Sequence, residues 1–281
     1  MTAFPLAQID QARFAAIRLI ATDIDDTLLR SDQTISPRTA DLIQQVQAVG
    51  KYFVLATARP PRSIRPLARE IGARGLVIAC NGALIFDLER DVIVQQHAIA
   101  PEVAQRAIHT VRAALPGVVF GCEAGMRFGC ESGYEDLRPI AQQQGAWRAD
   151  ALVFTQTPLT KLMVLHPTLV GEALLAVVAP LVGAEVICSY SGSPIVEINA
   201  AGVDKATGLA ELCQSLGIPA SAVIACGDMP NDIAMLRWAG LGVAVANAHP
   251  DVLAAADTRT SHHNEDGVAR VLERVLGQDA G

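Results

Sequence analysis

Acidic residues follow an apolar run near the start of the chain. The run Ile17–Thr22 is apolar enough for a strand buried on both faces, and Asp23, Asp25 and Asp26 come directly after it. In an extended segment, carboxylates at i and i+2 project to the same side, so Asp23 and Asp25 repel unless a cation or a proton intervenes. Hard oxygen ligands suit Mg²⁺. This cluster therefore predicts a Mg²⁺ and phosphate site, in preference to turn or helix-cap chemistry.

Two other segments offer groups that could bind phosphate. Thr57 follows the strand-like run Tyr52–Ala56, where its hydroxyl and nearby backbone N–H groups could hold phosphate oxygens, although a cap for the next helix is equally consistent. Lys205 begins a helical pattern, where a cation is unfavourable for the helix dipole. Because the chain has only three lysines against 19 arginines, this placement indicates that Lys205 pairs with another charge.

A fourth segment, GDMPND at 227–232, lies between a predicted strand and a predicted helix. Gly227 permits a close backbone approach, and Asp228 and Asp232 would add oxygen ligands beside the first acidic cluster. The alternative for Asp232 is a plain acidic charge at a helix start.

Strands and helices alternate at both ends of the chain and predict a doubly wound α/β layer with a parallel sheet. Ligands gather at the carboxyl ends of the strands in such a sheet. The middle differs, because its strands arrive in pairs, which indicates an antiparallel sheet with helices. We therefore expect a core domain of residues 1–85 and 199–281 and an inserted α+β domain of residues 86–198. The expected helices are residues 37–49, 62–71, 101–115, 169–182, 205–216, 231–239, 251–255 and 267–276. The expected strands are residues 17–22, 52–56, 76–80, 84–86, 92–95, 118–122, 126–130, 161–166, 185–190, 195–198, 222–225, 241–245 and 257–260.

The four segments, in this order, resemble the four motifs of the haloacid dehalogenase (HAD) superfamily. DIDDT resembles its first motif, Thr57 its second, Lys205 its third and GDMPND its fourth. The stretches ATAR, CNGA, PIVEINAAGVDK, VAVANA and EDGVAR are similar to those of the Cof-type, class IIB phosphatases. The resemblance implies a Rossmann-like core with a type C2 cap inserted between the second and third motifs. One departure is Asp26, where many relatives carry glycine.

The resemblance also implies roles for single residues. Asp23 would be the nucleophile and Asp25 the acid/base, with Lys205 bridging Asp23 and the phosphoryl group. Mg²⁺ would be held by Asp23, Asp228 and the backbone carbonyl of Asp25, with Asp232 supporting. Phosphate and substrate contacts are expected from Ile24, Thr57, Ala58, Asn81, Gly82 and Asn231, the last orienting Lys205 or the phosphate. Leaving-group selection is expected from the cap, with Arg127, Arg138, Arg148 and Lys161 as candidates.

Composition and charge limit the classes of partner that we expect the protein to bind. The chain has 281 residues and a net charge of −7, without the basic stripe of a nucleic-acid binder. It shows no 18-residue apolar run and no signal-peptide pattern, so we expect a cytoplasmic protein, monomeric or homodimeric, without membrane partners. The six cysteines contain no CxxC pair, which argues against zinc. His262 and His263 lie in a polar stretch and are expected in a surface loop.

The expected function is a Mg²⁺-dependent phosphatase acting on a small phosphorylated metabolite, a sugar phosphate or a phosphorylated cofactor. A phosphomutase would use the same residues and differ only in its product. A non-catalytic phosphoacceptor module would need neither the insertion nor Asp25.

Overall fold

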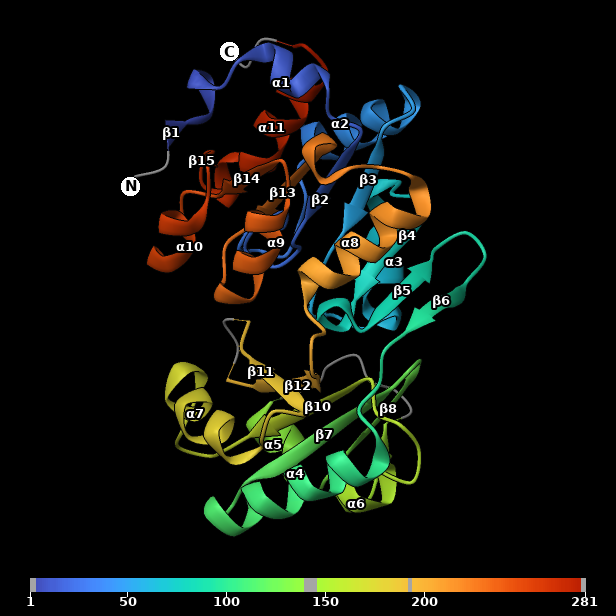
Figure 1. Cartoon of the computed structure of the whole chain (residues 1–281), viewed down its shortest axis with the longest axis vertical. Coiled ribbons are helices and arrows are strands. Elements are labelled where there is room, and N and C mark those ends of the chain that lie inside the picture. The colour runs from blue at the N-terminus through green and yellow to red at the C-terminus, as the bar shows by residue number, and fades with distance from the viewer. Residues whose placement is uncertain (1–3, 139–145, 192–193, 279–281) are drawn as a thin grey trace. The chain divides into compact units, whose positions relative to one another are not determined.

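The computed structural model describes residues 4–138, 146–191 and 194–278. The chain forms two compact units, shown in Figure 1: unit 1 is Met1–Val94 with Asp204–Gly281, and unit 2 is Gln95–Val203. The expected crossing after residue 85 lies inside unit 1, and the expected return at residue 199 lies inside unit 2.

The main sheet of unit 1 has six strands, all parallel, which confirms the predicted α/β class. Their order is β1 (Phe4–Pro5), β15 (Thr258–Arg259), β14 (Leu241–Ala244), β13 (Val223–Gly227), β2 (Leu19–Thr22) and β3 (Tyr52–Leu55). In the central register Ile20 lies opposite both Ile224 and Phe53. Strands β2, β13 and β14 are buried at every position, as expected for strands covered on both faces.

Helices connect these strands. They are α1 (Gln11–Ala15), α2 (Pro37–Ala48), α3 (Pro61–Ile71), α8 (Lys205–Leu216), α9 (Ile233–Trp238), α10 (Pro250–Ala255) and α11 (Gly267–Val275). Leu19 and Ala21 of β2 share a core cluster with Leu209 of α8 and Met235 of α9. Short elements such as β1 and α1 were not predicted, because segments of two to five residues carry no readable periodicity.

A second sheet holds β4 (Leu76–Ala79), β5 (Leu84–Asp87) and β6 (Val92–Gln96), and it lies in unit 1 except for the last two residues of β6. An isolated parallel bridge joins Ala56, just after β3, to Ile78 of β4. A short 3₁₀ turn, η2 (Cys80–Gly82), connects β4 to β5. The turn that follows β3 and the turn that follows β4 are therefore neighbours.

Unit 2 contains a mostly antiparallel sheet, as predicted for the middle of the chain. The strand order is β11 (Val186–Ser189), β12 (Val196–Ala200), β10 (Lys161–Leu165), β7 (Val119–Ala124), β8 (Arg127–Cys130) and β9 (Trp147–Arg148), with only β8 and β9 parallel. Its helices are α4 (Pro101–Ala114), α5 (Tyr134–Leu137), α6 (Ala151–Phe154) and α7 (Gly171–Val178). Helix α7 is shorter than expected, because a 3₁₀ turn with Pro180 follows it.

Candidate active site

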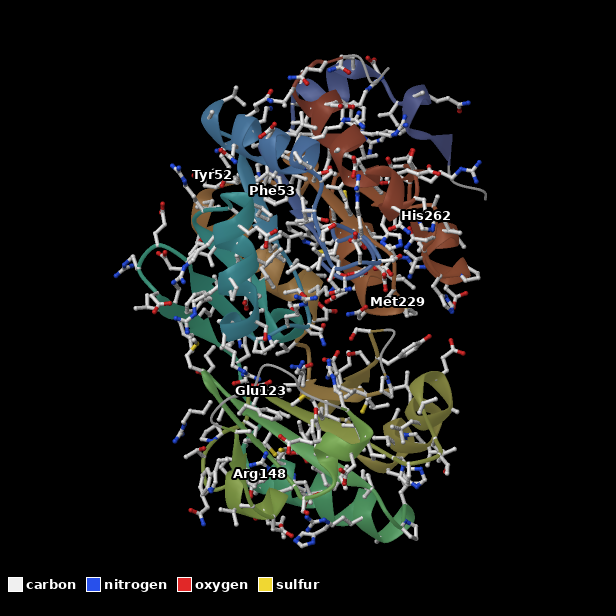
Figure 2. All side chains as sticks on the ribbon, turned by 180° about the vertical axis from the view of Figure 1, so that it is seen from behind. Tyr52, Phe53, Glu123, Arg148, Met229 and His262 are labelled. Atoms are coloured by element: carbon white, nitrogen blue, oxygen red, sulfur yellow. The ribbon has the colours of Figure 1, made fainter. Side chains whose placement is uncertain are left out.

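The predicted site residues of unit 1 gather at the carboxyl ends of its parallel strands. Strands β13, β2 and β3 are neighbours, so Asp228, Asp23 and Thr57 follow adjacent strands at one edge of the sheet. Tyr52, which begins β3, and Met229, which follows β13, mark the two opposite ends of this sheet in Figure 2.

Lys205 is enclosed by two carboxylates. Its Nζ donates to Oδ1 of Asp23 at 2.6 Å and to Oδ1 of Asp232 at 2.7 Å. The Lys205 side chain is only 1% exposed, so its charge needs these partners to remain in the interior. Burial lowers the pKa of Lys205, but the two carboxylates more than offset this effect and raise it above its ordinary value. The expected pairing of Lys205 with another charge is thus present.

Gly227 lets Asp232 lie across the end of β13. A Cβ at Gly227 would stand 2.5 Å from the Cβ of Asp232, a distance that side chains do not tolerate. The Oδ2 atom of Asp232 accepts hydrogen bonds from the backbone N–H groups of Asp228 (3.0 Å) and Met229 (3.1 Å). Because both of its oxygens have protein partners, Asp232 braces Lys205 and the loop after β13.

Three carboxylates form a candidate metal centre. Asp23, Asp228 and Asp232 are all buried, and one carboxylate oxygen from each lies within 4.8 Å of the others. Asp228 accepts a hydrogen bond from the hydroxyl of Thr27 at 2.7 Å. The second oxygens of Asp23 and Asp228 have no hydrogen-bond partner among the described residues. Two free hard oxygens beside a surplus of negative charge fit a divalent cation such as Mg²⁺.

The charge surplus is visible in the pKa values. Burial raises the pKa of Asp23 to about 7, opposed by Lys205 and reinforced by Asp232 and Asp25. Burial and the charges of Asp23 and Asp232 raise the pKa of Asp228 to about 8, although the Thr27 hydroxyl lowers it. The single ammonium group does not balance the acidic groups, so a bound dication would relieve their repulsion.

Asp25 stands apart from this cluster. Its carboxylate is 42% exposed and makes a bidentate pair with the guanidinium of Arg59. The Arg59 Nε donates to Oδ2 of Asp25 at 2.8 Å, and Nη2 donates to Oδ1. Sequence reasoning did not single out Arg59, although it stands two residues after Thr57 in the quoted ATAR stretch.

Thr57 is fully buried and does not cap α3, which removes the alternative role considered for it. Helix α3 begins after Pro60, whereas the Thr57 hydroxyl accepts a hydrogen bond from the backbone N–H of Arg59 at 3.1 Å. Its hydroxyl proton has no acceptor among the described residues, so it can still be donated to a phosphate oxygen. The backbone N–H groups of Cys80 and Asn81 donate to the carbonyls of Arg59 (3.1 Å) and Thr57 (3.0 Å).

The turn η2 has an unusual backbone that positions several of these groups. Cys80, Asn81 and Gly82 have φ values of +52°, +57° and +93°, which is strained for the first two residues. A Cβ at Gly82 would lie 1.9 Å from the carbonyl oxygen of Asp204, so the start of α8 rests directly on this turn. Gly82 therefore has a packing role that fixes the backbone next to Lys205. Its role in substrate binding stays a prediction.

The hydrogen bonds of the Lys205 ammonium go to Asp23 and Asp232 and not to Asn231. The Asn231 amide nitrogen donates to Oδ1 of Asn81 at 3.2 Å, and Asp232 takes the place expected for it beside Lys205. The Oδ1 atom of Asn231 is buried without a partner among the described residues, so it is open to a ligand donor. The side chain of Ile24 is fully buried, and Ala58 is half-buried; a substrate contact of either would come from its backbone.

One expectation about the histidines is wrong. His263 is only 5% exposed, and its Nδ1 lies 2.8 Å from the carbonyl oxygen of Leu29. The polar stretch folds back on the loop that follows β2, where the backbone N–H of His263 also donates to Asn247. Its neighbour His262, labelled in Figure 2, is half-exposed.

The expected specificity residues of unit 2 have different environments. Lys161 is buried and donates to Glu197 at 2.5 Å, whereas Arg148 is exposed and pairs with Glu135. Arg127 and Arg138 are exposed. All six cysteines are free thiols, and the acidic cluster described above contains none of them. No helix among the described residues is long and apolar enough to cross a membrane.

Comparisons with known proteins agree with this fold. Residues 20–272 match the family model of haloacid dehalogenase-like hydrolases. The chain is 30% identical over 92% of its length to a 5-amino-6-(5-phospho-D-ribitylamino)uracil phosphatase of Bacillus subtilis, covering 97% of that protein. It is also 30% identical over 91% of its length to a phosphoglycolate phosphatase of Natronomonas pharaonis, covering 96%.

A solved structure of a sugar phosphatase of HAD subclass IIB superposes with a TM-score of 0.81 at 22% identity, covering 92% of this chain and 99% of that one. The core with an inserted antiparallel sheet is therefore the fold of this subclass. The chain belongs to the haloacid dehalogenase-like hydrolases, and within them to the phosphatases, which are phosphoric monoester hydrolases.

Proposed function

We propose that the protein hydrolyses the phosphate monoester of a small metabolite through an aspartyl-phosphate on Asp23, with Mg²⁺ as its metal. The observation that carries this proposal is the buried contact of Asp23 with Lys205 beside the free oxygen of Asp228. An anionic nucleophile and an anionic phosphate repel each other, and the centre supplies one fixed cation and the ligands for a second.

Each residue of the centre has a distinct task in this proposal. The free oxygen of Asp23 attacks phosphorus while the bond from phosphorus to the leaving oxygen breaks. Asp25 gives its proton to that oxygen and later takes one from the water that cleaves the aspartyl-phosphate. Lys205 holds Asp23 and neutralises charge on the phosphoryl group, and Thr57 donates its hydroxyl proton to a phosphate oxygen.

The metal would be held by Asp23, by Asp228 and by the backbone carbonyl of Asp25, with Asp232 as a brace. When bound, Mg²⁺ supplies positive charge against the phosphate and aligns it with the nucleophile. Asp228 keeps a free oxygen for this purpose while its other oxygen is fixed by Thr27.

The substrate is proposed as a small phosphorylated metabolite, because relatives act on compounds as different as a ribitylaminouracil phosphate and phosphoglycolate. We propose that unit 2 is the cap that selects among such compounds.

The direct test is hydrolysis of 4-nitrophenyl phosphate with Mg²⁺ and with EDTA. We expect release of one inorganic phosphate per nitrophenol with Mg²⁺, strong loss with EDTA, and loss of roughly 10⁴-fold or more in Asp23→Asn. Asp41→Asn, an exposed carboxylate on α2, is the matched control and should keep wild-type turnover. An Asp23→Asn enzyme with normal turnover would remove the nucleophile from the proposal. Transfer of the phosphoryl group to a second hydroxyl without phosphate release would identify a mutase instead.

A further inference from the structure

Arg59 has no role in the scheme so far, yet its guanidinium pairs with both carboxylate oxygens of Asp25. Asp23 is held by burial and by Lys205, but the Asp25 carboxylate is 42% exposed and lacks such enclosure. Among the described residues, Arg59 is the hydrogen-bond partner of both Asp25 oxygens. The orientation of Asp25 therefore depends on this guanidinium.

Arg59 is itself held by hydrogen bonds of its backbone and of its guanidinium. Its backbone N–H donates to Thr57, and its carbonyl accepts from the strained turn η2 at Cys80. Its Nη2 also donates to the side-chain oxygen of Gln33 at 3.0 Å. A planar guanidinium fixed in this way sets the direction of a carboxylate more strictly than a flexible ammonium can.

We propose that Arg59 is a positioning residue that aims Asp25 at the leaving oxygen and stabilises the carboxylate that Asp25 becomes. This inference rests on the proposed function. As the bond from phosphorus to the leaving oxygen breaks, the Asp25 proton moves to that oxygen, and the negative charge left on Asp25 meets the Arg59 guanidinium. In the second half of the reaction the water oxygen bonds to phosphorus as the bond from Asp23 to phosphorus breaks, and the Asp25 carboxylate takes a proton from that water.

This role makes a specific kinetic prediction. A leaving group that is itself a good acid departs without much help, whereas a basic leaving group needs the proton. If Arg59 serves Asp25, its loss should slow basic leaving groups selectively. A residue that merely binds phosphate or supports the fold would slow all leaving groups alike.

The experiment compares kcat/KM for 4-nitrophenyl, phenyl and 4-methoxyphenyl phosphates, which share a shape but differ in leaving-group basicity. In Arg59→Ala we expect a loss of roughly 100-fold with 4-methoxyphenyl phosphate and of less than about tenfold with 4-nitrophenyl phosphate. Asp25→Asn should show the same ordering, and the double variant should lose little more than Asp25→Asn. Added guanidinium ions should restore part of the loss in Arg59→Ala.

Arg65→Ala is the matched control, because Arg65 lies on α3, which begins two residues after Arg59, and pairs with Asp91 at the surface. It should leave all three rates near the wild-type values. If Arg59→Ala does not fold, Arg59→Lys is the deciding variant, because it keeps the positive charge but cannot make the bidentate pair. It should show the same ordering of the three substrates with a smaller loss of kcat/KM. Equal losses for the three substrates, or none, would overturn the inference. A wild-type enzyme inactive on all three would instead count against the proposed function.

Discussion

Binding of Mg²⁺ should depend steeply on pH. The two carboxylates with free oxygens have pKa values raised by burial, to about 7 for Asp23 and about 8 for Asp228. The metal requires both in the ionised form, so it must displace their protons. Changing the pH from 6 to 8 therefore changes the fraction of molecules ready to bind the metal.

The size of the effect follows from these two values. Both carboxylates are ionised together in about 45% of molecules at pH 8, about 5% at pH 7 and about 0.1% at pH 6. The apparent affinity should fall about tenfold from pH 8 to pH 7 and about 50-fold more from pH 7 to pH 6. At pH 7, Mg²⁺ binding should release between one and two protons, because Asp23 is about half protonated and Asp228 largely so.

The same protons determine the stability of the metal-free protein. Both pKa values lie above the ordinary value of 3.8, so between about pH 4 and pH 8 the folded chain holds protons that the unfolded chain has released. The free energy of unfolding therefore falls as pH rises through this window, and bound Mg²⁺ should offset the fall. Stabilisation by the metal is expected to be larger at pH 8 than at pH 6.

Isothermal titration calorimetry at three pH values, in two buffers of different ionisation enthalpy, measures both the affinity and the released protons. Urea unfolding with and without Mg²⁺ gives the stability. An affinity that stays constant from pH 6 to pH 8, without proton release, would refute the electrostatic account of this centre. Asp41→Asn serves again as a control that should change none of these quantities.

Three further predictions concern single positions of unit 1. Lys205→Met leaves the buried carboxylates of Asp23 and Asp232 without their cation, so it should lower the free energy of unfolding by about 3–5 kcal/mol in EDTA. This loss of stability should be smaller at pH 5 than at pH 8. An unchanged urea midpoint would contradict the prediction. Gly82→Ala should destabilise the protein by more than about 2 kcal/mol in thermal unfolding, since its Cβ would stand 1.9 Å from the Asp204 carbonyl and its φ is +93°. Asp26→Gly should be neutral or stabilising by up to about 1 kcal/mol, because Asp26 has φ +52°, and a clear drop in Tm would show that the Asp26 side chain contributes more than its backbone costs.

The departure at Asp26 also shows what a motif comparison can explain once coordinates are present. The motif resemblance leads us to expect glycine at this position, and the left-handed backbone there is the conformation that glycine adopts without strain. Asp26 is exposed and its carbonyl accepts a hydrogen bond from Asn247 at 2.7 Å. The backbone geometry thus accounts for the expectation of glycine at position 26.

The sequence alone predicted the elements that carry the centre. Helix α8 begins at Lys205 and ends at Leu216, as its periodicity indicates. Helix α2 begins at Pro37 as predicted, where the Ser36 side chain accepts a hydrogen bond from the backbone N–H of Thr39. These features are local, because apolar spacing and capping depend on residues a few positions apart. Since parallel strands bring their carboxyl ends to one edge, the sequence also predicted that Asp23 and Asp228 would converge. The place of Lys205 beside Asp23 was implied by the family resemblance.

Only the tertiary structure decided which side chains pair within that cluster. Lys205 binds Asp232 and not Asn231, Arg59 holds Asp25, and His263 is buried against the loop after β2. These partners lie 27, 34 and 234 residues apart in the chain, so no local pattern connects them. Their pairing depends on strand order and on close contacts such as that of Gly227 with Asp232, which exist only when the sheet has formed.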